Sequence, residues 1–148
     1  MAFVELKEII TKMFQGQKLG VLISQAEIYP YPTLVAFHNS QDLTTIICAT
    51  SKKSKKFDNI TKSPNVSFLL NDSRNAPDDF SDASVVTAFG TASCLERRDV
   101  KKDLVSGLEH KHPKLNTFFG DPDTVFIVIK VERYQVIREF QKVHEFKP

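Results

Sequence analysis

Apolar residues along much of this chain gather in short runs bounded by turn-forming residues, a pattern typical of β-strands. Three short segments rich in β-branched residues come first, and turn-forming residues separate them. We expect antiparallel strands at 19–24, 33–37 and 44–50. Later strands are expected at 66–70, at 84–95, and over 124–131 and 133–140, as one long strand or two consecutive ones. Gly90 interrupts the 84–95 segment, which indicates a bend or a close backbone approach.

Helical spacing of apolar residues is confined to three places. We expect helices over 3–15, over about 54–62, and from Glu96 to about His110. The apolar face of the first helix consists of Phe3, Leu6, Ile10 and Met13 or Phe14. Between the second helix and the 84–95 strand, the polar, acidic stretch 71–82 is expected to be an exposed loop. Strands outnumber helices two to one, and short turns join most neighbours. This favours a mainly β antiparallel barrel with flanking helices over a doubly wound parallel sheet.

Composition limits the remaining possibilities. With 148 residues, 41% of them hydrophobic, the chain is long enough for a single domain over residues 1–148. The formal net charge is only +2, so any anion site must be local. The chain has no run of 18 apolar residues and no export signal, so we expect a cytoplasmic protein without a membrane span. Cys48 and Cys94 lie in strand-like stretches and are expected to be buried free thiols.

The clearest candidate chemistry lies in the run Ala49–Lys56, which we call the lysine segment. It places four lysines among hydroxyl side chains where a predicted strand ends and a predicted helix begins. Its members are Ala49, Thr50, Ser51, Lys52, Lys53, Ser54, Lys55 and Lys56. Unpaired N–H groups at a helix start, hydroxyls and ammonium groups together suit a phosphate. Lysines at a helix N-terminus are slightly unfavourable without an anion. Solvated lysines without a ligand are the alternative interpretation of this run.

Four segments, taken in order, give the chain a family resemblance. They are Pro32–Phe37, Ala49–Thr50 with Ser54–Lys56, Asn65–Leu70, and Ala88–Ala92. Together they resemble the pyridoxamine 5'-phosphate oxidase-like, FMN-binding split-barrel superfamily over roughly residues 3–140. The match in the lysine segment is the most specific, because a threonine, a serine four residues on and two consecutive basic residues recur together there. The resemblance implies a six-stranded antiparallel split β-barrel of Greek-key topology.

In that superfamily, a basic pair and its hydroxyl neighbours hold the FMN phosphate, which the resemblance carries over to Ser54, Lys55 and Lys56. The strand 33–36 is expected to lie along the isoalloxazine ring, mainly through backbone groups and apolar side chains. The resemblance also implies a homodimer with FMN at the subunit interface. The full set of expected FMN-binding residues is Thr33, Leu34, Val35, Ala36, Ala49, Thr50, Ser51, Lys52, Ser54, Lys55 and Lys56.

Departures from the superfamily pattern argue against oxidation of a vitamin B6 compound. Leu34 stands where true pyridoxamine-phosphate oxidases carry a basic residue, and Val85 stands where they carry a polar flavin contact. The chain also has no Trp, although those enzymes end in a segment with a tryptophan and an arginine–histidine pair that grips the substrate phosphate. We therefore expect an FMN-dependent oxidoreductase that acts on a small organic substrate, with no catalytic residue assigned.

Alternatives stay open beside this interpretation. A non-enzymatic module that stores or senses flavin, or binds haem with His38 or His144, fits the same cleft, and a deazaflavin could replace FMN. A nucleic-acid binder is disfavoured by the near-neutral total charge and by the lack of paired exposed aromatic residues. His110 and His112 do not indicate a metal site, because residues two apart point to different sides of a helix.

Overall fold

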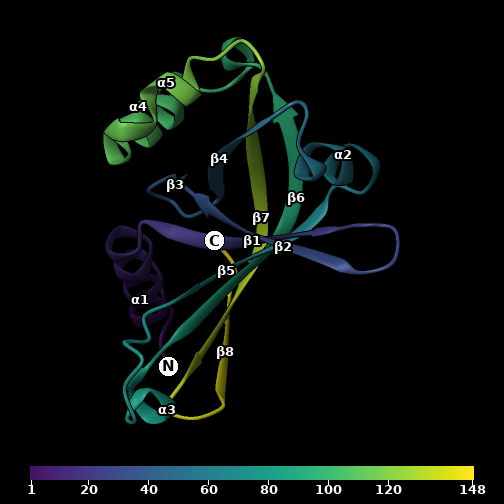
Figure 1. Cartoon of the computed structure of the whole chain (residues 1–148). Coiled ribbons are helices and arrows are strands. Elements are labelled where there is room, and N and C mark those ends of the chain that lie inside the picture. Colours follow the sequence, from purple (N-terminus) through teal and green to yellow (C-terminus); the bar gives the residue numbers. More distant parts are fainter.

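The computed structural model describes residues 1–148, and Figure 1 shows a strongly curled sheet flanked by helices. The strands are β1 (Leu19–Gln25), β2 (Pro30–Ala36), β3 (His38–Asn39), β4 (Thr45–Ser51), β5 (Asn65–Asn71), β6 (Val85–Leu95), β7 (Thr124–Arg138) and β8 (Lys142–Phe146). The helices are α1 (Phe3–Gly16), α2 (Lys55–Lys62), α3 (Asp79–Asp82), α4 (Lys102–Lys111) and α5 (Asn116–Phe119), with 3-10 turns at Arg97–Asp99 and Pro113–Leu115. None of these helices combines the length and apolar character that a membrane crossing requires.

All strand pairs are antiparallel, in the spatial order β2-β1-β5-β6-β7-β4-β3, with β8 paired to β7. Only Phe37 separates β2 from β3, so one stretch of chain borders both ends of the sheet and curls it into a barrel. Beyond that residue, β2 and β4 approach each other without pairing, which leaves the barrel split. The order β4-β7-β6-β5 is a Greek key, because β4 lies beside β7 and reaches β5 through the connection that contains α2.

The mainly β fold and the antiparallel split barrel are thus confirmed, but the expected number of strands is wrong, because the sheet has eight rather than six. Phe37 interrupts the pairing of one extended stretch, so β2 and β3 are separate strands. β8 adds a hairpin to the end of β7. The turn before β8 contains three residues with positive φ, namely Glu139, Phe140 and Gln141. None is the glycine or asparagine that marks such turns in a sequence.

The two longest strands, β6 and β7, pair along most of their length, and β7 is one continuous strand. Their register shifts between Phe89 and Gly90, which marks a β-bulge. A Cβ at position 90 would overlap the main-chain carbonyl of Lys130 on β7. The close backbone approach expected at Gly90 is therefore confirmed, and it requires a residue without a side chain.

A large apolar cluster fills the barrel and includes one face of α1. Leu6, Ile10, Met13 and Phe14 are all buried there, so both candidates at the C-terminal end of the helical face belong to the core. Phe3 differs from the expectation, because its side chain is 59% exposed. It lies at the edge of the cluster, with its ring 4.7 Å from that of Phe146 on β8.

A second apolar cluster attaches α4 to β4 and β7, through Leu104, Val105 and Leu108 against Ile47 and Phe126. The helix expected from Glu96 to His110 is correct in its apolar face but wrong at its start. A 3-10 turn ends at Asp99, and α4 begins only at Lys102. Val100 is extended between them because its side chain is buried in this second cluster.

The stretch 71–82, expected as a loop, is mostly exposed but ends in α3. Asp79, the first residue of α3, folds the stretch back on itself, because its carboxylate accepts hydrogen bonds from the N–H groups of Arg74 and Ala76. These side-chain contacts are local, and they give the acidic stretch an order that its composition does not indicate.

Candidate functional site

The lysine segment lies at the end of β4 and the beginning of α2, on the right of Figure 1. Ser54 is the N-cap of α2, and its Oγ accepts a hydrogen bond from the Phe57 N–H at 3.2 Å. The helix is held against β1 by a buried hydrogen bond of 3.1 Å from the Asn59 side-chain amide to the Ser24 hydroxyl. A short helix with only eight residues is thereby fixed in place by its cap and by one buried polar contact.

Hydroxyl groups join the end of β4 to the start of α2. Thr50 is 3% exposed, and its Oγ1 lies 2.6 Å from Ser54 Oγ. Ser51 Oγ accepts a hydrogen bond from the Lys53 N–H at 3.1 Å, and the Ser51 carbonyl accepts one from the Ser54 N–H at 3.0 Å. These contacts form a tight turn, so the side chains and N–H groups that follow it project from a rigid base.

Two of the four lysines in the segment are neutralised within the chain. Lys52 Nζ lies 2.8 Å from Glu96 Oε1, and Lys53 Nζ lies 3.4 Å from Asp123 Oδ2. The ion pair with Lys52 also lowers the pKa of the Glu96 carboxyl group, first through the hydrogen bond and then through the charge. Both pairs are solvent-accessible, so each contributes little to stability. Their effect is to remove two of the four positive charges from the surroundings of the helix N-terminus.

Lys55 and Lys56 have no ion pair. Their backbone N–H groups, in the first turn of α2, also have no acceptor in the chain. Lys56 is half-buried, and its charge acts on Cys48 of β4, although burial prevails and raises the pKa of that thiol to about 12. Two ammonium groups, two free N–H groups and the Ser54 hydroxyl form a donor set for a phosphate group.

The split of the barrel is bordered by the unpaired edges of β2 and β4. β3 pairs only with Ile46 and Ile47, so β4 has a free edge from Cys48 to Ser51, directly before α2. β2 pairs with β1 alone and has its other edge free over 30–36. Free backbone donors and acceptors therefore line the split, next to the lysine segment, where a planar ligand could meet them.

The strand residues predicted to contact a ring do not share one orientation. Leu34 is 65% exposed on the outer face, whereas Val35 is buried in the barrel. Thr33 Oγ1 donates a weak hydrogen bond of 3.5 Å to the Leu22 carbonyl. Ala49 packs toward the second apolar cluster, away from the barrel interior. Val35 and Ala49 can therefore offer a ligand only their backbone groups, because their side chains pack against the apolar clusters.

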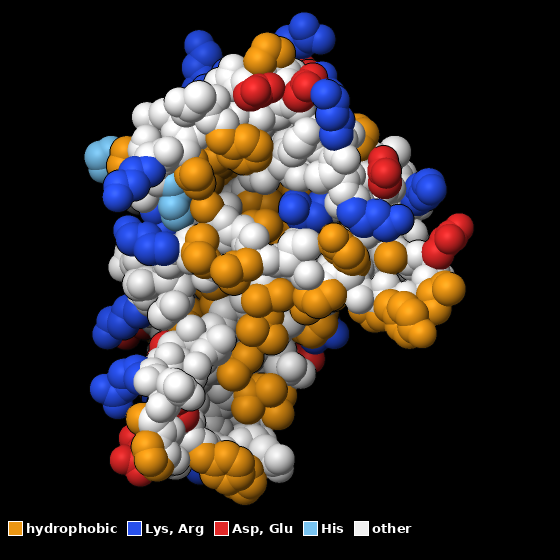
Figure 2. Space-filling view, viewed as in Figure 1, with side chains coloured by type: hydrophobic (Ala, Val, Ile, Leu, Met, Phe, Trp, Pro, Cys, Tyr) orange, Lys and Arg blue, Asp and Glu red, His pale blue; other side chains and the backbone are white.

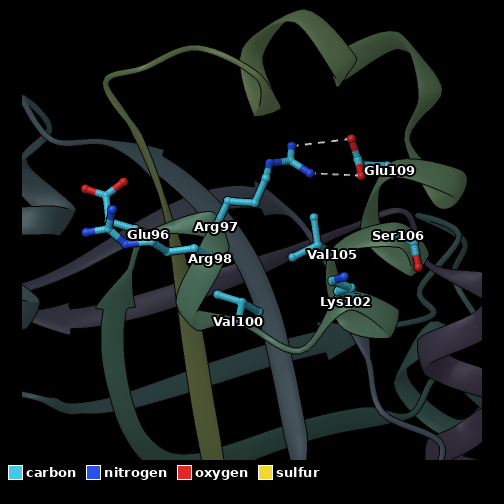
Figure 3. Close-up of a pocket in the computed structure, with 8 residues that line it drawn as sticks. All are labelled: Glu96, Arg97, Arg98, Val100, Lys102, Val105, Ser106 and Glu109. Carbon is cyan, nitrogen blue, oxygen red and sulfur yellow. Dashed lines mark hydrogen bonds and ion pairs between the residues drawn. The ribbon is translucent and has the colours of Figure 1, made fainter.

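A cavity of about 640 Å³ adjoins the lysine segment through Glu96, the partner of Lys52. Figure 3 shows Arg97 pointing across this cavity toward Glu109, with hydrogen bonds of 3.3 and 3.4 Å. Arg97 also donates a hydrogen bond of 3.2 Å to the Phe119 carbonyl, so its guanidinium group already has partners within the chain. The lining consists of Glu96, Arg97, Arg98, Val100, Lys102, Val105, Ser106 and Glu109. Lys102 has no ion pair, whereas the charge of Arg98 acts on Glu96 and helps to lower the pKa of that carboxyl group.

Sequence reasoning missed the residues that support the lysine segment from a distance. Asn59 stands out as a polar residue on the buried face of α2, which is a local signal that could have been found. Ser24, Glu96 and Asp123 give no such signal, because each comes from a different part of the chain. No group of three or more His, Cys, Asp or Glu side chains is placed to hold a metal ion.

Comparison with known protein families shows which family the chain belongs to. The family model described as pyridoxamine 5'-phosphate oxidase matches residues 6–138, which is most of the chain. The chain belongs to this family. The resemblance that rests on the lysine segment and the strands around it is thereby confirmed. A search of the curated proteins finds no match for this family member.

Solved structures of other proteins show the same fold. General Stress Protein 26 from Bacillus anthracis str. Sterne is 26% identical, with a TM-score of 0.68 over 96% of this chain and 99% of that protein. Campylobacter jejuni ChuZ is 13% identical, with a TM-score of 0.80 over 99% of this chain and 61% of that protein. The heme binding protein from Mycobacterium smegmatis is 14% identical, with a TM-score of 0.78 over 95% of this chain and 57% of that protein. The chain thus spans about three fifths of the length of the last two proteins.

Proposed function

We propose that this family member binds FMN and acts as a flavin-dependent oxidoreductase on a small organic substrate. The observation that carries the proposal is the pair Lys55 and Lys56. Neither has an ion pair, and both adjoin free N–H groups at the N-terminus of α2, so positive charge and hydrogen-bond donors gather there without an anion. In a family of this kind, a phosphate is the anion that such a donor set favours. The split between β2 and β4, beside these donors, would receive the ring.

When bound, flavin supplies the electron or hydride transfer, so the protein needs only to hold, orient and shield the reacting groups. Lys55 and Lys56 would bind the phosphate together with the first N–H groups of α2, and Ser54 would keep that turn rigid through its contacts with Thr50 and Phe57. The free edges of β2 and β4 would bind the ring through backbone groups. No side chain in the split is required to move a proton, and we assign none as a catalytic acid or base.

Vitamin B6 oxidation is not the activity that we propose. Leu34, on the outer face of β2, offers no charge to a substrate phosphate, and Val85 offers no polar contact to flavin. The cavity beside Glu96 contains Lys102 without an ion pair, and its ammonium group favours an acidic substrate. A small organic acid or a nicotinamide nucleotide meets that description.

We further propose that the protein is a homodimer with FMN at the subunit interface. The β1–β2 hairpin projects from the barrel and carries apolar side chains into solvent, as the right side of Figure 2 shows. Three large ones are Ile28, Tyr29 and Leu34, which are 78%, 76% and 65% exposed. An apolar surface of this kind beside a split that needs covering suits a second copy of the chain. Ile28→Glu should yield monomers by light scattering, whereas Val143→Glu, a matched change at an exposed position of β8, should leave the dimer intact.

Flavin absorbance of the purified protein, followed by titration with FMN and with riboflavin, tests the cofactor. Riboflavin lacks the phosphate, so Lys55→Ala with Lys56→Ala should weaken FMN binding by about tenfold or more and leave riboflavin binding nearly unchanged. A double change of Lys12→Ala with Lys62→Ala, at exposed positions on α1 and at the C-terminal end of α2, removes the same charge and serves as the control. Failure to bind any flavin, or equal losses for FMN and riboflavin, would overturn this assignment.

A second candidate function is binding of haem or storage of flavin without turnover. The observation that favours it is the likeness of fold to the heme binding protein from Mycobacterium smegmatis. His38 and His144 were the candidate ligands, and both are partly buried. His144, on β8, is the candidate that we retain, because the His38 ring packs against Gly107 of α4. Haem binding would give a Soret band that shifts on His144→Ala. Bound flavin without oxidation of reduced nicotinamides would instead indicate a storage or sensor role.

A further inference from the structure

A second cavity lies between α1, β3 and α4, on the left of Figure 1 and away from α2. Its volume is about 760 Å³, which is within the range of small-molecule pockets. Its charged and titratable lining consists of Lys7, Lys18, His38, His110 and Lys111, and no carboxylate lines it. Figure 2 shows basic side chains gathered along this edge of the molecule. We call this cavity the basic pocket.

Helical spacing brings the α1 side of the basic pocket together. Lys7 and Thr11 are four residues apart on one face of α1, and Lys18 follows two turns later, just beyond the helix end. From the opposite wall, the last turn of α4 contributes His110 and Lys111. Residues far apart in the sequence therefore direct positive charge into one hollow.

Two of these side chains are fixed by packing. Lys111 Nζ donates a hydrogen bond of 2.9 Å to the Phe14 carbonyl and lies 3.8 Å from the centre of the Phe37 ring. Burial, aided by the charge of Lys18, lowers the pKa of Lys111 to about 8. The His38 ring packs against α4 at Gly107, where a Cβ would overlap the ring. Lys111 and His38 thus form a preformed wall of the pocket, and the exposed Lys7 and Lys18 lie at its rim.

The positive charge of the basic pocket has no counter-ion in the chain. None of its lysines has an ion pair, and Asp103 is the only carboxylate whose charge acts on His38. The whole chain has a net charge of only +2, so this local excess is not a consequence of a generally basic protein. Like charges gathered in a concave site raise the local concentration of anions.

We propose that the basic pocket binds a small soluble molecule that carries a phosphate or pyrophosphate group. Phe14 is the only hydrophobic residue in the lining, which disfavours flat aromatic ligands such as flavin or haem. Thr11, Gln15 and Asn39 add neutral hydrogen-bonding groups that suit a hydroxyl-rich ligand. The site is separate from the lysine segment, so the proposal does not depend on flavin binding.

Inorganic pyrophosphate, titrated by calorimetry at low ionic strength, is the probe for this site. Lys7→Gln with Lys18→Gln should weaken its binding by at least about tenfold, because two charged contacts are removed. Lys12→Gln with Lys62→Gln, on exposed positions outside the pocket, should have little effect. The imidazole NMR signals of His38 and His110 should shift on titration, whereas that of His144 should not.

Lys55→Ala with Lys56→Ala separates the two anion sites, since pyrophosphate binding to the basic pocket should persist in that variant. Loss of binding there, equal losses in the Lys12 and Lys62 control, or no binding to the unchanged protein would each overturn the proposal. Vesicles that contain phosphatidic acid should not sediment the protein. Sedimentation that depends on Lys7 and Lys18 would instead assign the pocket to a lipid headgroup.

Discussion

The hydroxyl pair Thr50 and Ser54 offers a direct test of how the lysine segment is held in place. Ser54→Ala removes the cap of α2, which costs about 1 kcal/mol. It also takes away the partner of the buried Thr50 hydroxyl, which costs about 1 kcal/mol more. We therefore expect the free energy of unfolding to fall by about 2 kcal/mol.

Thr50→Val keeps the shape of the side chain and removes only its hydroxyl, so it should cost about 1 kcal/mol. Ser54 would still cap the Phe57 N–H in that variant. The two hydroxyls share one hydrogen bond, so the double variant should lose about 2 kcal/mol rather than the sum of about 3 kcal/mol. The difference of about 1 kcal/mol is the coupling energy of the pair.

Urea unfolding of the four proteins in this cycle gives these energies, provided that the slope with denaturant stays constant. Ser63→Ala, at the other end of α2, is the control, because the Ser63 side chain makes no hydrogen bond and its loss should change stability very little. Strict additivity of the two changes would refute the shared hydrogen bond. An effect of Ser63→Ala as large as that of Ser54→Ala would refute the specific role of the cap.

Three further predictions concern the barrel. Gly90→Ala should lower stability by about 1–3 kcal/mol or more in urea unfolding, because its Cβ would overlap a carbonyl of β7; unchanged stability would contradict the close approach. Tyr134→Phe removes a buried hydrogen bond of 2.7 Å to the Leu43 carbonyl and should cost about 1–2 kcal/mol, with no loss expected if that bond is not formed. Burial raises the pKa of Cys48 to about 12, and the partial burial of Cys94, which the sequence predicted to be buried, raises its pKa to about 11. Both thiols should therefore stay protonated at pH 8 and react with a disulfide reagent far more slowly than a free thiol. Fast labelling of the folded protein would disprove this.

Features that depend on neighbouring residues could be predicted from the sequence. The residues around 54–62 are enough to predict α2, because Ser54 is a typical N-cap residue and Pro64 follows the end of the helix. The close approach at Gly90 could be predicted because an isolated glycine inside a strand usually marks a bulge or a close contact between backbones. In each case, the signal lies within a few residues of the structure that it specifies.

Features that depend on tertiary packing could not be predicted in the same way. β8 follows a turn whose left-handed residues, such as Phe140, carry no turn signature, so the hairpin has no local signal. The early end of the 3-10 turn before α4 depends on burial of Val100 against strands from other parts of the chain. The basic pocket combines α1, β3 and α4, and no stretch of sequence predicts that Lys18 and His110 line the same hollow.

The lysine segment combines both kinds of information. Its four lysines are evident in the sequence, but only the fold pairs two of them, Lys52 and Lys53, with carboxylates from distant segments. Two ammonium groups remain at the N-terminus of α2, where positive charge is unfavourable without an anion. A phosphate monoester carries a charge of about −1.5 to −2 at pH 7, which matches the two that remain. The fold therefore reduces a run of four positive charges to two unpaired ammonium groups, at the start of a helix whose first turn also contains Asp58.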